Sequence, residues 1–248
     1  MRNRNLRSFL RKEESDSGPP HSRGRAVLVG LVFCLLAGSA LAAQFGSSQY
    51  PIRADDGDEI TNFTLSPELS ADLAKLPGQV PVGNLAGDVI LLQFYDLNCP
   101  YCREAAADVD ALVKSDKKLK LVFVPYAVLS VQSVQGGLVE LAAARQLTPD
   151  KFLSLHRRIY AGGRGLIDAN RVASAAQAEG LDPRTLVDSA NSPATSAALK
   201  QNADFGSVAK LVATPAYVIN GVVLLGHPGL KPLQKIVAAM RACGKVMC

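Results

Sequence analysis

The segment from residue 89 to residue 124 constrains the fold most, because two apolar runs flank a helical pattern. Residues 89–95 (VILLQFY) and 120–124 (KLVFV) consist mainly of residues that favour β-strands. Residues 100–115 place their apolar side chains on one helical face. A strand, a helix and a strand in this order predict a βαβ unit whose strands pair in parallel. We therefore expect an α/β protein.

A pair of cysteines marks the junction between the first strand and the helix. Cys99 and Cys102 are three residues apart, so their sulfur atoms face the same side of the helix and can form a disulfide. Pro100 suits the first helical position, where its missing N–H is not needed. Cys99 then lies at the helix N-terminus, where free N–H groups and the helix dipole favour a thiolate. The pattern predicts that Cys99 attacks in disulfide exchange and that Cys102 is the resolving thiol.

The same spacing is also half of a tetrahedral zinc site, so a non-catalytic copper or zinc module using Cys99 and Cys102 is the competing hypothesis. The other three cysteines do not repeat this spacing, and only two methionines follow residue 43. His156 and His227 are expected on a solvated helix face and in a loop, not as ligands. We therefore favour the redox hypothesis, with no metal and no cofactor other than the redox-active disulfide.

The first 43 residues predict export. Residues 1–25 hold seven Lys and Arg against three acidic residues, and residues 26–43 carry no charge and end in small residues. This pattern indicates either a signal peptide that is cleaved or a signal anchor that stays in the membrane. In both cases the remainder of the chain is expected in the periplasm or another extracytoplasmic space. Beyond residue 25 there are 20 basic and 19 acidic residues, so no nucleic-acid partner is expected.

Turn-forming residues divide the rest of the chain. Residues 44–60 are expected to be a polar tether, and residues 61–248 the folded domain. From about residue 130 to residue 208 the pattern is helical, and we expect four helices there, separated by Pro and Gly. Asn220-Gly221 between two apolar runs predicts a tight hairpin. Residues 231–242 form an amphipathic pattern typical of a final helix.

Two more cysteines lie at the C-terminus. Cys243 and Cys248 have four residues between them. In an oxidising compartment disulfides persist, so this pair is a candidate for a structural disulfide. The closed loop would be small, and the bond would stiffen the C-terminus more than it stabilises the core.

Residues 94–102 (FYDLNCPYC), the helical stretch, Thr214-Pro215 and the final hairpin and helix together resemble the DsbA family of exported thiol–disulfide oxidoreductases, over about residues 80–242. The resemblance implies a thioredoxin-like fold with a helical insertion domain. It also implies that Pro215 is cis, lies against the two cysteines and exposes backbone groups to an extended substrate segment. Thr214 is then expected to contact the substrate, and Tyr101 is expected either to contact it or to modulate access to Cys99.

The resemblance also implies the partners. These are cysteine-containing exported proteins and a membrane or exported redox partner. The protein would act on the exported proteins as an oxidase or as a reductase, and we favour the oxidase. Isomerases of this kind typically need a dimerisation domain, and residues 44–80 look too short to provide one. We therefore expect a monomer.

Gln93 departs from the family pattern. Six residues before the nucleophile the family commonly has a buried carboxylate, which is thought to manage the proton of the second cysteine. An amide cannot exchange a proton at neutral pH, so a relay would need water, Asp96 or Glu104. A neutral Gln93 also removes a negative charge that would oppose the Cys99 thiolate. We expect Gln93 to lie beneath the disulfide and, with Pro100, to tune its chemistry.

Overall fold

The computed structural model describes residues 48–248. The predicted basic segment, the apolar run with Cys34, and residues 44–47 of the expected tether lie outside these residues. Within the described part, no helix is long and apolar enough to cross a membrane.

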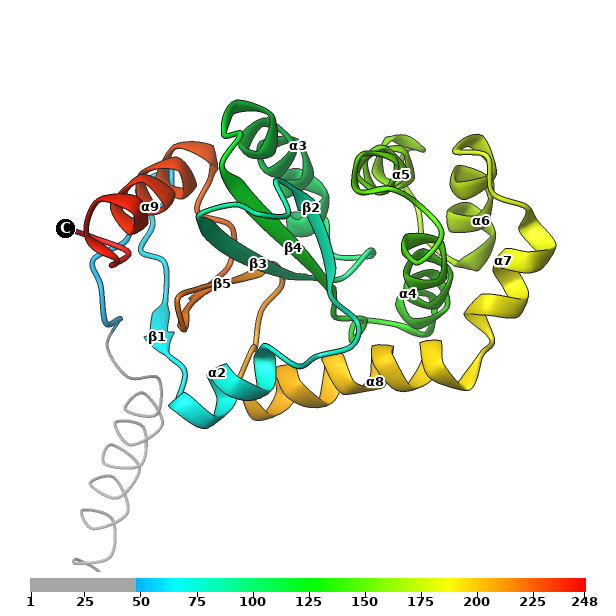
Figure 1. The fold of residues 1–248 in the computed structure, drawn as a ribbon, viewed down its shortest axis with the longest axis horizontal. Helices are drawn as coiled ribbons and strands as arrows, with labels where there is room; N and C mark the ends of the chain where they lie inside the picture. The colour runs from blue at the N-terminus through cyan, green and yellow to red at the C-terminus, as the bar shows by residue number, and fades with distance from the viewer. Residues whose placement is uncertain (1–47) are drawn as a thin grey trace, which may run out of the picture. The chain divides into compact units, whose positions relative to one another are not determined.

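A six-stranded mixed sheet forms the centre of the structure, in the order β1-β6-β5-β3-β4-β2 (Figure 1). The predicted βαβ unit is confirmed: β3 (Val89–Tyr95) and β4 (Leu119–Pro125) pair in parallel and are joined by α3 (Pro100–Ser115). β5 pairs antiparallel with the other side of β3. The remaining strands are β1 (Asn62–Thr64), β2 (Val80–Gly83), β5 (Ala216–Ile219) and β6 (Val222–Leu225).

Side chains of β3 alternate between two hydrophobic cores. Leu91 and Tyr95 belong to one core, which includes Cys99 and Cys102, whereas Phe94 belongs to the other. α3 and α9 (Leu230–Cys243) cover the first face, and α2 (Pro67–Leu73) and one end of α8 (Pro193–Val208) lie against the second (Figure 1). Since alternation has a period of two residues, Gln93 lies on the cysteine side of the sheet.

The helical insertion contains five helices, so the expectation of four is wrong. Each helix begins at a side chain that caps its N-terminus, and four of the five have Ser, Thr or Asp directly before Pro or Ala at the first position. The short helix of residues 183–190 begins at one such cap, Asp182, and the next helix begins at another, Ser192. The short helix is therefore a separate element and not an extension of its neighbour. The five helices are α4 (Val131–Ala144), α5 (Pro149–Ala161), α6 (Ala169–Ala178), α7 (Pro183–Ala190) and α8.

The hairpin between β5 and β6 has the predicted turn. Its central residues, Asn220 and Gly221, have φ values of 47° and 77°. Positive φ at both positions matches the turn type that suits the twist of a hairpin, and Asn-Gly is the sequence that best tolerates it. The prediction is confirmed.

Residues 48–60 do not form the expected polar tether. Ile52 and Ile60 are buried in the core, and the Ile60 N–H donates to the Ile52 carbonyl at 2.9 Å. The Asp55 N–H donates to the Pro228 carbonyl, also at 2.9 Å. The two buried isoleucines favour this fold-back of a segment whose composition is otherwise polar, because each buried isoleucine contributes about 1.5–3 kcal/mol.

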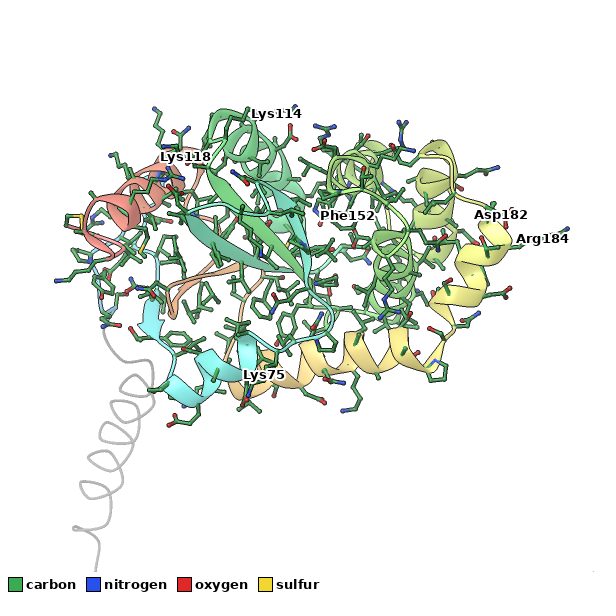
Figure 2. All side chains as sticks on the ribbon, viewed as in Figure 1. Lys75, Lys114, Lys118, Phe152, Asp182 and Arg184 are labelled. Carbon is green, nitrogen blue, oxygen red and sulfur yellow. A yellow bond between two sulfur atoms is a disulfide. The ribbon has the colours of Figure 1, made fainter. Side chains whose placement is uncertain are left out.

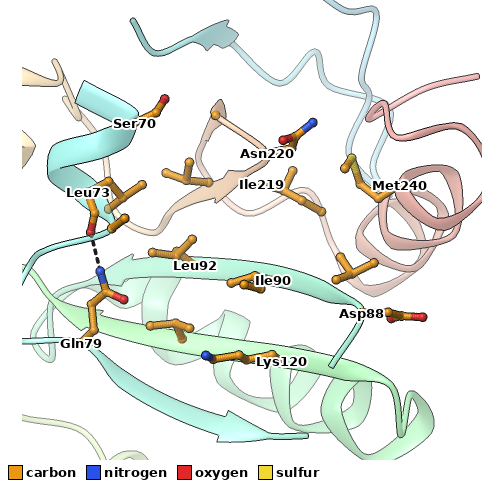
Figure 3. Close-up of a pocket in the computed structure, with 15 residues that line it drawn as sticks. Ser70, Leu73, Gln79, Asp88, Ile90, Leu92, Lys120, Ile219, Asn220 and Met240 are labelled. Atoms are coloured by element: carbon orange, nitrogen blue, oxygen red, sulfur yellow. Dashed lines mark hydrogen bonds between the residues drawn. The ribbon is translucent and has the colours of Figure 1, made fainter. Parts of the chain in front are cut away.

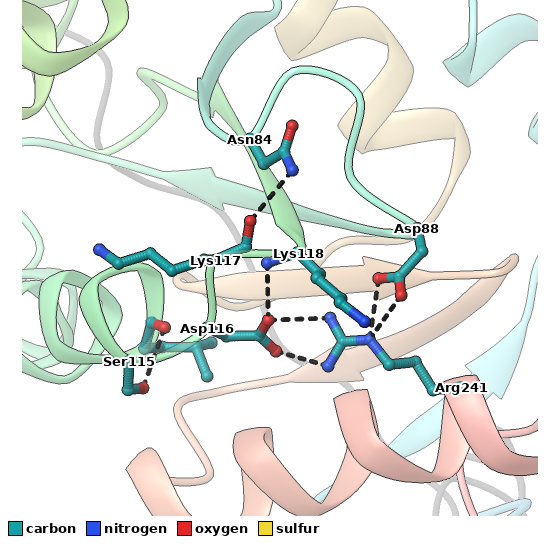
Figure 4. Close-up of polar contacts among 8 residues, drawn as sticks. Asn84, Asp88, Ser115, Asp116, Lys117, Lys118 and Arg241 are labelled. Carbon is teal, nitrogen blue, oxygen red and sulfur yellow. Dashed lines mark hydrogen bonds and ion pairs between the residues drawn. The ribbon is translucent and has the colours of Figure 1, made fainter.

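The C-terminal helix is fixed at its end by a disulfide and an ionic cluster. Cys243 and Cys248 are bonded, and the bond appears in yellow beside α9 in Figure 2. Arg241 donates to Asp88 at 2.8 Å and to Asp116 at 2.7 Å (Figure 4). These two carboxylates lie before β3 and after α3, so one guanidinium connects α9 to both elements.

Candidate active site

Cys99 is the N-cap residue of α3, and Pro100 occupies the first helical position. The two cysteines are free thiols, exposed by only 4% and 1% for Cys99 and Cys102. As a thiol, Cys99 donates through Sγ to the Thr214 carbonyl oxygen at 3.1 Å. The chain segment after the helical insertion therefore lies directly against the first cysteine.

The environments of the two thiols shift their pKa values in opposite directions. The pKa of Cys99 is lowered to about 6, chiefly by a hydrogen bond from Cys102. Hydrogen bonds from the Thr214 side chain and from the backbone N–H groups of Cys102 and Tyr101 also lower it, whereas burial opposes the shift. The pKa of Cys102 is raised strongly, chiefly because burial disfavours its charged form and next because its proton is hydrogen-bonded to Cys99. At neutral pH the reduced pair is therefore one thiolate and one thiol.

Thr214 and Pro215 lie where the resemblance implied. The peptide bond between them is cis, and Pro215 is buried. The Pro215 carbonyl accepts from the Gly226 N–H at 2.9 Å, which holds this segment against the β6 end. Tyr101, in contrast, points to solvent, with 64% of its surface exposed.

Gln93 is buried beneath the site, with 2% of its surface exposed. Its Nε2 donates to the Tyr217 hydroxyl at 3.5 Å, and its Oε1 has no hydrogen-bond partner among the described residues. The two residues are direct neighbours across β3 and β5, so their side chains share the face that packs on α3.

Asp96 anchors the loops around the site. One carboxylate oxygen accepts from the Asn98 N–H at 2.8 Å and the Ser133 hydroxyl at 2.6 Å. The other accepts from the N–H groups of Val128 and Leu129 at 2.8 and 2.9 Å. With both oxygens occupied in this way, Asp96 has a structural role and is a poor candidate for moving a proton.

Sequence reasoning missed a buried pair in the insertion. His156 is buried, not solvated, and its Nδ1 lies 2.8 Å from a Glu140 carboxylate oxygen. The other oxygen of Glu140 accepts from the Tyr95 hydroxyl at 2.6 Å. A signal was present, since His156 follows the buried Phe152 by four residues and so shares its helical face.

No group of three or more His, Cys, Asp and Glu side chains between residues 48 and 248 is arranged to hold a metal ion. A copper or zinc module would need ligands from elsewhere to complete the set around Cys99 and Cys102. A groove of about 490 Å³ between the sheet, α2 and α9 is lined by Leu73, Ile90 and Met240, among others, and by neither cysteine (Figure 3).

A dithiol at a helix N-terminus, next to a cis-proline and against a central sheet, defines a thioredoxin-like oxidoreductase. Residues 75–239 match the family model described as Thioredoxin. The chain is 30% identical to a thioredoxin-like oxidoreductase from Silicibacter pomeroyi DSS-3, with a TM-score of 0.61, over 69% of this chain and 97% of that one. The protein therefore belongs to the thioredoxin family and is an oxidoreductase.

Two less similar structures share the fold. A periplasmic thioredoxin-like protein from Salmonella enterica serovar Typhimurium is 20% identical, with a TM-score of 0.59, over 73% of this chain and 99% of that one. The thiol-disulfide exchange protein alpha-DsbA2 from Wolbachia pipientis is 18% identical, with a TM-score of 0.60, over 71% and 100%. The comparison with curated proteins gives no match. The expected thioredoxin-like fold of the DsbA type is confirmed.

Proposed function

We propose that the protein is an exported thiol–disulfide oxidoreductase that oxidises cysteine-containing proteins. The observation that carries this proposal is the asymmetry of the pair: the pKa of Cys99 is lowered to about 6, and that of Cys102 is raised. A stabilised thiolate favours the reduced form of the pair, and a disulfide whose reduced form is stabilised is a stronger oxidant.

In the proposed reaction the enzyme starts as the Cys99–Cys102 disulfide. A substrate thiolate attacks Cys99 Sγ, a mixed disulfide forms, and Cys102 leaves and takes up a proton. A second substrate thiolate then attacks the substrate sulfur of the mixed disulfide, and Cys99 leaves as the stabilised thiolate. Two substrate thiols are oxidised and the enzyme disulfide is reduced, without another cofactor. A membrane or exported redox partner carrying a disulfide restores the oxidised enzyme.

Exposed apolar side chains around the cysteines support unfolded polypeptides as clients. Four of these side chains are each more than half exposed. Leu129 and Val131 follow β4, Leu166 lies in the loop before α6, and Val212 lies shortly before Thr214. The Leu129 N–H donates to Asp96, which holds the segment after β4 at the active-site edge. The Ile167 N–H donates to Asn98 Oδ1 at 2.7 Å, which holds the loop before α6 at the same edge. The Thr214 backbone and Tyr101 would contact an extended client segment beside Cys99.

The enzymatic test uses the oxidised protein and a reduced, unfolded model protein. We expect client disulfides to form, the Cys99→Ser variant to be inactive, and glutathione equilibration to give a potential more positive than the thioredoxin value of about −270 mV. A potential below that value would contradict the oxidase role. An insulin-reduction assay beside a copper and zinc titration separates the metal-binding alternative, because only that alternative predicts tight metal binding without turnover.

The proposed location rests on the basic segment and the uncharged residues 26–43. A fusion of alkaline phosphatase after Cys248 should be active, because that reporter folds only after export, and deletion of residues 26–43 should abolish its activity. Activity without residues 26–43 would contradict export by this segment. Sedimentation of residues 48–248 tests the proposed monomer.

A further inference from the structure

A chain of hydrogen bonds leads from the buried side of the active site to the surface. Gln93 Nε2 donates to the Tyr217 hydroxyl at 3.5 Å, and this hydroxyl lies 2.8 Å from Nδ1 of His227. Nε2 of His227 lies 3.0 Å from a carboxylate oxygen of Asp108, whose side chain is 38% exposed. The chain therefore begins in the core and ends in solvent.

The donors and acceptors in this chain have one consistent direction. The Asp108 carboxylate only accepts, so Nε2 of His227 carries a proton and Nδ1 is the acceptor. The Tyr217 hydroxyl then donates to Nδ1 and accepts from Gln93. A proton added at the Tyr217 oxygen can therefore move the phenolic proton to His227, and Asp108 stabilises the imidazolium that results.

Cys102 is buried in the same core as the inner end of the chain. Tyr217 pairs with Gln93 across the sheet, both on the face that packs on α3, and Cys102 belongs to the same core cluster as Tyr217. Burial raises the pKa of Tyr217 well above its usual value, and a Cys102 thiolate would raise it further. Tyr217 therefore keeps its phenolic proton at neutral pH.

We propose that Tyr217, His227 and Asp108 form the relay that removes the proton from Cys102 when this thiol resolves a mixed disulfide. The inference rests on the proposed function and deepens it. Gln93 has the role of a positioning residue, because its amide holds the Tyr217 hydroxyl without exchanging a proton itself. The thiol proton reaches the Tyr217 oxygen directly or through a water molecule.

The step balances as follows. In the proposed cycle this step occurs when the redox partner re-oxidises the enzyme and a sulfur of that partner is bonded to Cys99. Cys102 gives up its proton, its sulfur attacks Cys99 Sγ, and the bond between Cys99 and the partner sulfur breaks. The enzyme pair is oxidised to a disulfide, the partner sulfur is reduced and leaves as a thiolate, and the proton resides on His227 until it exchanges with solvent.

The experiment follows the reduced full-length protein with excess oxidised glutathione by rapid acid quench and mass spectrometry. Appearance of the mixed disulfide measures attack by Cys99, and its decay measures resolution by Cys102. For Tyr217→Phe we expect unchanged attack and at least tenfold slower resolution. For Asp108→Asn we expect a smaller slowing of the same step. Tyr160→Phe is the matched control, since this tyrosine is also buried and its hydroxyl meets only the Asp96 carbonyl, at 3.5 Å.

The pH profile distinguishes a relay from a packing effect. Without the relay, hydroxide has to remove the Cys102 proton. The rate of resolution in Tyr217→Phe should therefore rise tenfold per pH unit across neutral pH, whereas the rate in the wild type should rise less steeply. The charged or titratable groups of the elements that pack on the relay include Cys102 and Asp108 on α3 and Cys99 at its N-cap. They also include Asp55, whose N–H donates to the carbonyl of Pro228, the residue after His227.

A second variant tests the same point by rescue. Gln93→Glu in the Tyr217→Phe background places a carboxylate at the inner end of the chain, and it should restore resolution at neutral pH. Resolution that is unchanged in Tyr217→Phe, or slowed equally in Tyr160→Phe, would overturn the relay and leave the oxidoreductase proposal intact. If the wild-type protein formed no mixed disulfide with oxidised glutathione through Cys99, the proposed function itself would be wrong.

Discussion

At the scale of single residues, the chemistry depends on how one thiol stabilises the charge of the other. The largest cause of the low pKa of Cys99 is the hydrogen bond from Cys102. Cys102→Ala removes this donor, so the pKa of Cys99 should rise above about 6. Cys102→Ser keeps a hydroxyl donor at the same place, and its Cys99 pKa should stay closer to that of the wild type. The rate of iodoacetamide alkylation against pH measures both values.

The Ala and Ser variants control for each other, because both remove the resolving thiol. Both should trap client mixed disulfides on Cys99, whereas Cys99→Ser should trap none. Equal Cys99 pKa values in the two Cys102 variants would show that the helix N-terminus alone, and not the neighbouring thiol, sets the ionisation of Cys99.

Gln93→Glu should make the protein a weaker oxidant. Gln93 is buried on the cysteine side of the sheet, and an ionised carboxylate there would repel the Cys99 thiolate. The Cys99 pKa should rise, and the potential should become more negative, by about 30 mV for each unit of pKa. Alkylation and glutathione equilibration measure the two quantities. Gln93→Met is the neutral control, and an equal shift in both variants would assign the effect to packing.

At the scale of elements, Asp96 connects the end of β3 to the loop before α4. Its four hydrogen bonds come from backbone and side-chain donors, so Asp96→Asn would turn an NH₂ group toward donors that need an acceptor. We expect a loss of about 2–4 kcal/mol in the free energy of unfolding. Asp204→Asn, in an exposed pair with Lys200, should change it by less than about 0.5 kcal/mol. Urea titration measures both, and similar losses would contradict the anchoring role.

Elements defined by local patterns could be predicted from the sequence. The βαβ unit, the cysteine pair at the N-terminus of α3 and the Asn220-Gly221 hairpin depend on neighbouring residues, and the structure has all three. β1 and β2, of three and four residues, were missed because strands this short take their stability from pairing with β6 and β4. Their partners are more than 35 residues away in the chain.

The candidate site divides in the same way. Cys99 and Cys102 were found from spacing, and Thr214 and Pro215 from the family resemblance. The contacts of Tyr217 with His227 and of Asp96 with the β4 loop join segments that only the fold brings together. Burial of Ile52 and His156 was also missed, since one apolar or aromatic residue in a polar segment shows its environment only once the neighbouring elements are in place.

At the scale of the whole molecule, the two pKa shifts predict how stability depends on pH. The folded pKa of Cys99 is about 6, below the unfolded value of about 8.5. The reduced protein therefore gains stability as pH rises from about 6 to about 8.5, with a slope of at most about 1.4 kcal/mol per pH unit, and loses it as pH falls through 6. The folded pKa of Cys102 is raised, so above about 8.5 only the unfolded chain ionises there, and stability falls again.

The oxidised protein has no thiol at either position, so the difference in unfolding free energy between reduced and oxidised protein isolates this effect from all other titrations. We expect the difference to be largest near pH 8.5 and to decrease on both sides. Urea titration of both forms from pH 5 to pH 10 measures it, with the C-terminal disulfide kept intact in both. The Cys99→Ser variant cannot form this disulfide and is compared with the reduced wild type. Its unfolding free energy should lack the rise between pH 6 and 8.5 and keep the decrease above pH 8.5. A difference that does not vary with pH would contradict the opposite shifts of the two thiols, and with them the assignment of Cys99 as the nucleophile.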